Sequence, residues 1–206
     1  QSGLVAAIDA DILRQTCRDA RRMERIDPRI QFAVNVSATL FQQDGMLANL
    51  QSIIERSAVH PSRLKFELTE TAIMERADEA VALLTRLRAL GSDVIIDDFG
   101  MGYSSLSYVQ RLPVSGLKID RSFIAPIAPG NRSASIVRAI VALAQALGLH
   151  VTAEGVETEE QLETLREMNV DFVQGWYFSK ALRYDGLEAF VAERNGRREI
   201  AQAAVP

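Results

Sequence analysis

Short apolar runs rich in β-branched residues alternate with longer helical patterns along almost the whole chain, and this alternation restricts the fold more than any other feature. Nearly every residue within these runs is apolar, which is typical of parallel strands covered on both faces. The pattern predicts strands at six places: 32–36, 64–68, 94–97, 116–119, 151–153 and 172–174.

The segments between these runs have the spacing and the end signals of helices. Alanine and leucine recur at helical spacing between positions 80 and 87, and Gly91 predicts the end of that helix. The apolar helix at 133–147 has Ser133 as its predicted N-cap and Gly148 as its end. Thr158 and Gln161 form a capping-box pattern before the next helix.

A series of such strand–helix units predicts a parallel α/β fold, either a barrel or an open doubly wound sheet. No glycine-rich phosphate loop follows the first predicted strand, where an open dinucleotide-binding sheet carries one. Six units are too few for a closed eight-stranded barrel. We therefore expect either an open sheet or a TIM-like (β/α) barrel that is incomplete at its N-terminal end, with its first strands before Gln1.

The composition excludes several classes of function. With 206 residues, 48% of them hydrophobic, the chain can bury one large core or two small ones. A net charge of -4 excludes stable binding to duplex nucleic acid through a broad basic face. The single cysteine, Cys17, cannot form an internal disulfide or a thiolate metal site, which fits a cytoplasmic protein. The most apolar stretch, 136–151, is too short to span a bilayer.

Polar side chains stand at the carboxyl ends of all the predicted strands, and these ends meet at one face of a parallel barrel. An acid after one strand is often only a helix cap, but several acids brought together would repel one another unless a cation lay between them. The residues in question are Asn35, Glu67, Glu70, Asp97, Asp98, Lys118, Asp120, Glu154, Glu157 and Gln174.

The ligand types indicate which cation to expect. Neither His60 nor His150 ends a predicted strand, so the ligands are oxygen atoms, which favour Mg²⁺ or Mn²⁺ and also accept Ca²⁺. Asp97 and Asp98 can flank two metal ions, an arrangement typical of phosphodiester hydrolysis. Lys118 can orient a water molecule or neutralise a phosphate, or it can simply form an ion pair with a neighbouring acid.

Six strings in the chain, in this order, resemble the EAL-domain family of cyclic-di-GMP phosphodiesterases: VNVS, FELTE, DDFGMGYSSL, LKIDRSF, AEGVE and QGWYFSKAL. Each string alone is weakly specific, but together they cover nearly the whole chain. The resemblance implies a barrel that linearises cyclic-di-GMP to pGpG with Mg²⁺ or Mn²⁺, in a two-metal site where Ca²⁺ can bind without supporting activity.

The resemblance also implies a role for each residue at the strand ends. It assigns Asn35, Glu67, Asp97, Asp98 and Glu154 to metal binding, and Asp98, Lys118 and Glu154 to catalysis, with Glu154 as general base or metal ligand. Gln174 and Asp120 are assigned to substrate binding. Glu70 and Glu157 are expected to position the loop 99–106, which in the family couples the site to homodimerisation.

The chain departs from the family pattern at three places. Met101 stands where threonine is commoner, and Ala181 stands where proline is usual. The Glu-Ala-Leu tripeptide, with its metal-binding glutamate, is expected upstream of Gln1 together with the first strands. We therefore expect an EAL domain at 1–196 and a frayed tail at 197–206. We also expect impaired activity in the 206 residues alone, and a parent protein with an upstream sensory or cyclase domain that could anchor it to the inner membrane.

Three other functions remain open at this point. A non-catalytic cyclic-di-GMP receptor would have the same fold but would be expected to lose metal ligands. A scaffolding module could use the helix 133–147 as a dimer face. A sugar- or phosphate-processing barrel could use paired carboxylates for acid–base catalysis without a metal.

Overall fold

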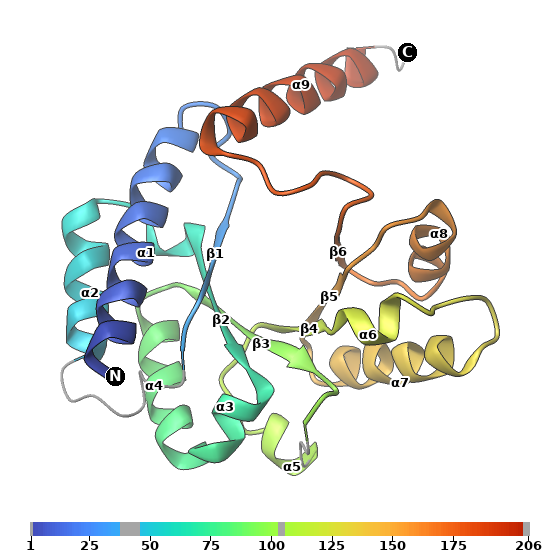
Figure 1. Cartoon of the computed structure of the whole chain (residues 1–206), viewed down its shortest axis with the longest axis horizontal. Helices are drawn as coiled ribbons and strands as arrows, with labels where there is room; N and C mark the ends of the chain where they lie inside the picture. The colour runs from blue at the N-terminus through green and yellow to red at the C-terminus, as the bar shows by residue number, and fades with distance from the viewer. Residues whose placement is uncertain (1, 38–45, 103–105, 204–206) are drawn as a thin grey trace.

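The computed structural model describes residues 2–37, 46–102 and 106–203 (Figure 1). Its elements in chain order are α1 (Ser2–Met23), β1 (Phe32–Asn35), α2 (Met46–Ser57), the 3₁₀ turn η2 (Pro61–Arg63), β2 (Leu64–Thr69), α3 (Glu70–Glu75), α4 (Ala77–Ala89), β3 (Asp93–Phe99), α5 (Leu106–Val109), β4 (Gly116–Ile119), α6 (Arg121–Ile124), α7 (Arg132–Ala146), β5 (His150–Glu154), α8 (Glu159–Glu167), β6 (Phe172–Gln174) and α9 (Tyr184–Ala203).

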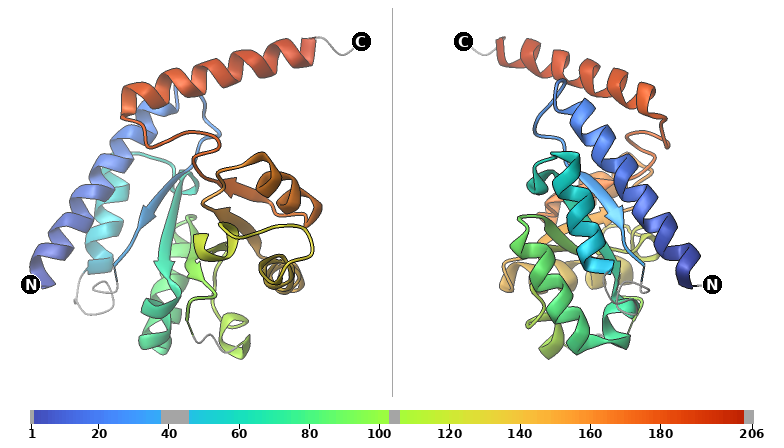
Figure 2. Two further views of the ribbon diagram at one scale, coloured as in Figure 1. Left: turned by 45° about the vertical axis from the view of Figure 1, so that its right-hand side comes forward. Right: turned by 90° about the vertical axis from the view of Figure 1, so that its left-hand side faces the viewer.

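The six predicted strands are confirmed, and all neighbouring strands pair in parallel. Their order in the sheet is β1-β2-β3-β4-β5-β6, the same as their order along the chain. A doubly wound sheet would reverse its order at a switch point, whereas a barrel adds each strand beside the previous one. The sheet is therefore a half-barrel, with helices packed around its outer side (Figures 1 and 2).

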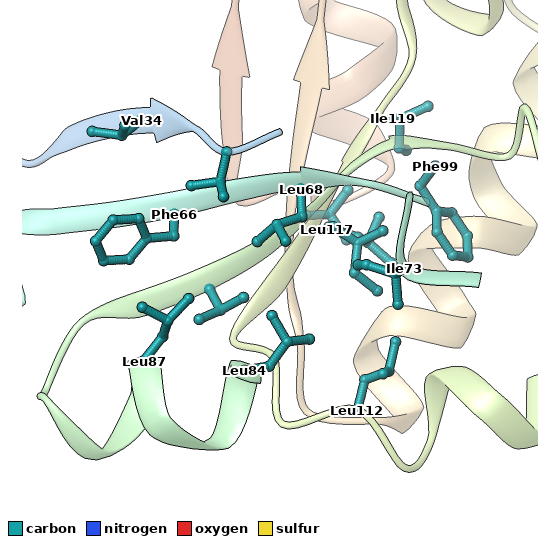
Figure 3. Close-up of a cluster of buried hydrophobic side chains, with 14 of the residues drawn as sticks. Val34, Phe66, Leu68, Ile73, Leu84, Leu87, Phe99, Leu112, Leu117 and Ile119 are labelled. Carbon is teal, nitrogen blue, oxygen red and sulfur yellow. The ribbon is translucent and has the colours of Figure 1, made fainter. Parts of the chain in front are cut away.

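Apolar and polar side chains alternate along the strands, whereas the sequence pattern predicts apolar side chains on both faces. The side chains that pack against the helices are apolar and buried, among them Phe66 and Leu68 of β2 and Leu117 of β4 (Figure 3). The intervening residues, such as Lys65 and Glu67, line the inner face. Because side chains alternate across a strand, one face of each strand contributes to the core while the other supplies polar groups to the interior of the half-barrel.

The predicted helix ends are correct except for one N-cap. Gly91 and Gly148 follow α4 and α7 with positive φ, and Thr158 with Gln161 forms the predicted capping box of α8. The prediction that Ser133 caps α7 is wrong. The cap is Asn131, whose side-chain oxygen accepts a hydrogen bond from the backbone N–H of Ala134 at 2.8 Å, because Ser133 already lies inside the helix.

The apolar face of α7 covers the sheet. Its side chains Val137, Val141 and Ala144 are buried in the core, and the helix contacts β4 and β5. The scaffolding hypothesis, which needs this face for a dimer, therefore loses its main support. None of the described helices combines the length and apolar character needed to cross a membrane.

The C-terminal helix α9 lies across the end of α1 and projects beyond the sheet (Figures 1 and 2). The Arg22 guanidinium of α1 stacks 3.8 Å from the centre of the Tyr184 ring. Most of the segment 197–206 has a helical backbone, since α9 ends at Ala203. The domain boundary at 196 and the fraying of the tail stay predictions.

Replacing Phe66 with alanine is expected to lower the free energy of unfolding by about 3–5 kcal/mol, because the ring is fully buried between sheet and helices. Phe172→Ala is the matched control: this ring lies on the edge strand β6 and is 49% exposed, so its loss should be less than about 1 kcal/mol. Urea unfolding followed by circular dichroism measures both. Equal losses would contradict the described core.

A polar network around Asp93 fastens the amino-terminal end of β3. Its carboxylate accepts hydrogen bonds from Arg88 at 2.7 Å, Ser115 at 2.8 Å and Gln31 at 3.3 Å. Burial alone would raise the pKa of Asp93, but the hydrogen bonds from Ser115 and Gln31 and the charges of Arg88 and Lys65 together lower it. The network therefore stabilises the fold above the pKa of the unfolded aspartate, about 3.9, and this contribution disappears as the pH falls through the lower folded pKa.

Asp93→Asn should consequently reduce the stability near neutral pH by up to about 1 kcal/mol, since the side chain is partly exposed. The difference between variant and wild type should vanish at acidic pH. Urea midpoints between pH 7 and about pH 2 test this, because the difference is lost only as the pH falls below about 3.9 and through the lower folded pKa; a difference that stays constant over this whole range would contradict it.

Candidate functional site

Four neighbouring strands bring charged side chains together at the carboxyl-terminal edge of the sheet. Glu67 comes from β2, Asp97 and Asp98 from β3, and Glu154 from β5. One carboxylate oxygen from each of Asp97, Asp98 and Glu154 lies within 4.8 Å of the others. Carboxylates at this separation repel one another, so the arrangement needs a positive charge between them.

Lys118 of β4 supplies such a charge. Its ammonium lies 2.5 Å from Glu154, 2.7 Å from Glu67 and 3.2 Å from Asp97, and the residue is only 5% exposed. Burial alone would lower the pKa of Lys118, but the hydrogen bonds to Glu154 and Glu67 and the charges of Glu67 and Asp97 raise it above its ordinary value. Of the alternatives that the sequence left open for Lys118, the structure shows ion pairs with the neighbouring acids.

The backbone of β3 explains how two adjacent residues can serve one site. Successive side chains of a regular strand point to opposite faces. The register with β4 shifts between Ile96 and Phe99, and Asp98 has a φ of 53°. This left-handed conformation costs a residue other than glycine about 1–3 kcal/mol and is typical of functional sites. It lets the carboxylate of Asp98 stay beside that of Asp97.

Two of these acids, Asp98 and Glu154, have pKa values above those of ordinary carboxyl groups. Burial is the largest cause of the raised pKa of Asp98, followed by the charges of Asp97 and Asp120. Burial also raises the pKa of Glu154, helped by the charges of Asp97 and Glu67 and opposed by Lys118. Raised pKa values in a cluster of acids are more frequent at functional sites than elsewhere.

The donor set fits a hard divalent cation. Asp97, Asp98 and Glu154 offer only carboxylate oxygens, which Mg²⁺ and Mn²⁺ prefer. Glu67 is joined to this group through Lys118. Asn35 is the parallel neighbour of Glu67 at the end of β1, so its amide lies at the same edge. The predicted metal ligands therefore lie along one edge, at the ends of β1, β2, β3 and β5, with β4 and its Lys118 between the last two.

The remaining predicted residues have partners nearby. Buried Glu70 accepts hydrogen bonds from the backbone N–H groups of Gly100 at 2.8 Å and Gly102 at 3.4 Å, at the start of the loop 99–106, of which 103–105 lie outside the described residues. Glu157 forms an ion pair with Arg121 at 2.7 Å. Asp120 accepts a hydrogen bond from the Ser122 N–H and so caps α6, while Gln174 pairs with Glu154 in the sheet.

A cavity of about 400 Å³ adjoins the acids on the side of β6. Glu154 and Gln174 form one part of its wall. Trp176, Arg121, Lys180 and Glu157 also line the cavity, and the sequence patterns assign no role to the first three of them. A signal was available, because Trp176 is the only tryptophan of the chain and directly follows the predicted strand end at Gln174.

The EAL domain family matches residues 1–181 of the chain. Among curated proteins, the cyclic di-GMP phosphodiesterase NbdA of Pseudomonas aeruginosa is 42% identical over 191 residues, which make up 92% of this chain and 24% of NbdA. The bifunctional diguanylate cyclase/cyclic di-GMP phosphodiesterase MucR of the same organism is 40% identical over 93% of this chain and 28% of MucR. The chain thus spans about a quarter of the length of these relatives.

Solved structures show the same fold. The c-di-GMP complex of the PaMucR phosphodiesterase superposes with a TM-score of 0.85 at 39% identity, covering 90% of this chain and 75% of that chain. A calcium and cyclic-di-GMP complex of Klebsiella pneumoniae BlrP1 superposes with a TM-score of 0.77 at 28% identity, over 85% of this chain and 44% of BlrP1.

Proposed function

The chain belongs to the EAL domain family of cyclic-di-GMP phosphodiesterases, and from this membership we propose that it hydrolyses cyclic-di-GMP to linear pGpG with Mg²⁺ or Mn²⁺. The observation that carries the proposal is the cluster of three carboxylates from Asp97, Asp98 and Glu154. One oxygen of each lies within 4.8 Å of the others. A non-catalytic receptor would not need so many acids in one place, because each of them disfavours an anionic ligand.

We assign Asn35, Glu67, Asp97, Asp98 and Glu154 to a two-metal site. When bound, the divalent ions supply a water molecule of lowered pKa and positive charge next to the phosphate oxygens. Ca²⁺ fits the same oxygen ligands, and we propose that it binds without supporting turnover. The calcium complex of BlrP1 shows that a protein with this fold can be crystallised with that ion.

Two side chains of the chain act on the reactants: Glu154 on the attacking water and Lys118 near the phosphate. Glu154 takes a proton from the attacking water, whose oxygen forms a new bond to phosphorus. The bond from phosphorus to the 3′ oxygen breaks, and this oxygen takes up a proton, which leaves pGpG. Lys118, held at 2.5 Å from Glu154 and 2.7 Å from Glu67, fixes both carboxylates and adds positive charge near the phosphate.

Other roles follow from the surroundings of the site. Gln174 and Asp120 are proposed to contact the substrate, and Glu70 to hold the loop 99–106 through Gly100. Glu157 is proposed to act on the same loop, although its ion pair in the structure is with Arg121. We also propose a homodimer in the cytoplasm and control by an upstream sensory or cyclase domain, as the bifunctional name of MucR suggests for that relative.

The test compares the 206 residues with a chain extended upstream by about 45 residues, roughly two further strand–helix units of a barrel. Each is incubated with cyclic-di-GMP and Mg²⁺ or Mn²⁺, and pGpG is measured by chromatography, with EDTA as the metal-free control. We expect pGpG from the extended chain and little from the 206 residues, because the glutamate of the family's Glu-Ala-Leu tripeptide, expected upstream of Gln1, would add an anionic ligand.

Two other results would contradict parts of the proposal. Tight binding of cyclic-di-GMP without any pGpG from either chain would indicate a receptor. Hydrolysis that continues in EDTA would exclude the metal-dependent mechanism.

A further inference from the structure

An exposed tryptophan lies in the wall of the cavity beside the acid cluster. Trp176 follows the end of β6 by two residues, and 61% of its surface is exposed. Its indole shares the cavity with Glu154 and Gln174. Because this ring lies in the wall of a polar cavity beside Glu154 and Gln174, it offers a flat aromatic surface on which a bound ligand can stack.

Two cations flank this ring without covering it. The Arg121 guanidinium and the Lys180 ammonium each lie 5.7 Å from the ring centre, whereas Arg22 packs at 3.8 Å on the ring of Tyr184. The longer separation and the high exposure leave the indole able to stack on an incoming group.

The two cations differ in how far they are neutralised. Arg121 forms a 2.7 Å ion pair with Glu157. Lys180 forms no ion pair with any acid in the described part of the chain. The wall of the cavity therefore keeps one positive charge that no ion pair compensates in the described part of the chain.

A flat aromatic surface beside a free ammonium matches one half of a nucleotide. Nucleobases stack on tryptophan regardless of their hydrogen-bonding edges, and a phosphate pairs with lysine as a point charge. We propose that Trp176 stacks on one guanine base of cyclic-di-GMP and that Lys180 pairs with the phosphate that is not cleaved. This inference rests on the proposed function, and it assigns two substrate-binding residues outside the strand-end acids.

The test measures the Kd of cyclic-di-GMP for the extended chain in Ca²⁺ by isothermal titration. Trp176→Ala should weaken binding about 10- to 100-fold, the range that loss of one base–aromatic stack gives, and Trp176→Phe should retain most of the affinity. Lys180→Gln should weaken binding and make Kd less dependent on salt. Arg183→Gln is the matched control, because it removes a positive charge from the same segment without lining the cavity.

Fluorescence gives a second readout that a merely structural role would not produce. Stacking should quench the emission of Trp176, and the quench should be missing in Trp176→Phe. Circular dichroism melts and Mn²⁺ affinity should match the wild type in every variant, since the side chain is exposed and is not a metal ligand.

The outcomes separate this inference from the proposed function. If the wild type binds cyclic-di-GMP and Trp176→Ala binds it equally well without any quench in the wild type, the stacking role is overturned while the phosphodiesterase proposal stands. If the wild type binds no cyclic-di-GMP in Ca²⁺, Mg²⁺ or Mn²⁺, the proposed function fails and this inference fails with it.

Discussion

Replacing Glu154 with glutamine is expected to lower the kcat of cyclic-di-GMP hydrolysis by about 10²- to 10⁴-fold, the range that loss of a general base usually gives. The glutamine amide keeps the shape of the side chain and can still accept the hydrogen bond from Lys118. It cannot take a proton from water. The measurement is the initial rate of pGpG formation by the extended chain at saturating substrate and Mn²⁺.

The concentration of metal distinguishes the two roles open to Glu154. A loss that persists at saturating Mn²⁺ supports a proton acceptor, whereas a loss that high Mn²⁺ reverses would identify Glu154 as a metal ligand only. Glu163→Gln, which changes an exposed acid of α8 in the same way, should leave the rate unchanged. A rate for Glu154→Gln within about threefold of the wild type would contradict both roles.

In the absence of divalent ions, Lys118→Met is expected to lower the free energy of unfolding by about 3–5 kcal/mol. Lys118 is the one positively charged side chain that the described ion pairs place among these buried acids, and the substitution removes its charge. Glu67, Asp97 and Glu154 would then repel one another. Mn²⁺ should restore part of the stability, since it supplies the missing positive charge. Urea unfolding in EDTA and in Mn²⁺ measures the effect.

The pH dependence of this variant has a defined sign. Burial and the charges of Asp97 and Glu67 already raise the pKa of Glu154, and removing Lys118 removes the opposing effect, so protonated Glu154 supports the fold at low pH and this support is lost as the pH rises. The destabilisation should therefore be smaller at pH 5 than at pH 8. Lys180→Met, which removes an exposed lysine outside these three ion pairs, is the control and should show little change. A wild-type-like unfolding curve for Lys118→Met in EDTA would show that the ion pairs do not stabilise the fold.

The amino-acid sequence alone specifies the strands, most helix ends and the identity of the polar residues at the strand ends. Each of these depends on contacts or preferences among residues close together in the chain, such as the capping box of Thr158 and Gln161 or the helical spacing of the buried residues in α4. The error at α7 has the same local origin, because Asn131 and Ser133 are both good caps and their competition depends on where the helix begins.

The tertiary structure decides which of these residues meet. Lys118 and Glu67 are 51 positions apart, and only the order β2-β3-β4 brings their charges to 2.7 Å. The left-handed backbone at Asp98 depends on the register of β3 against β4, which no neighbouring residue in the chain signals. Trp176 becomes part of the cavity because β6 lies beside β5. Sequence patterns record the preferences of single segments, whereas distances between strand ends are fixed by the packing of the whole sheet on its helices.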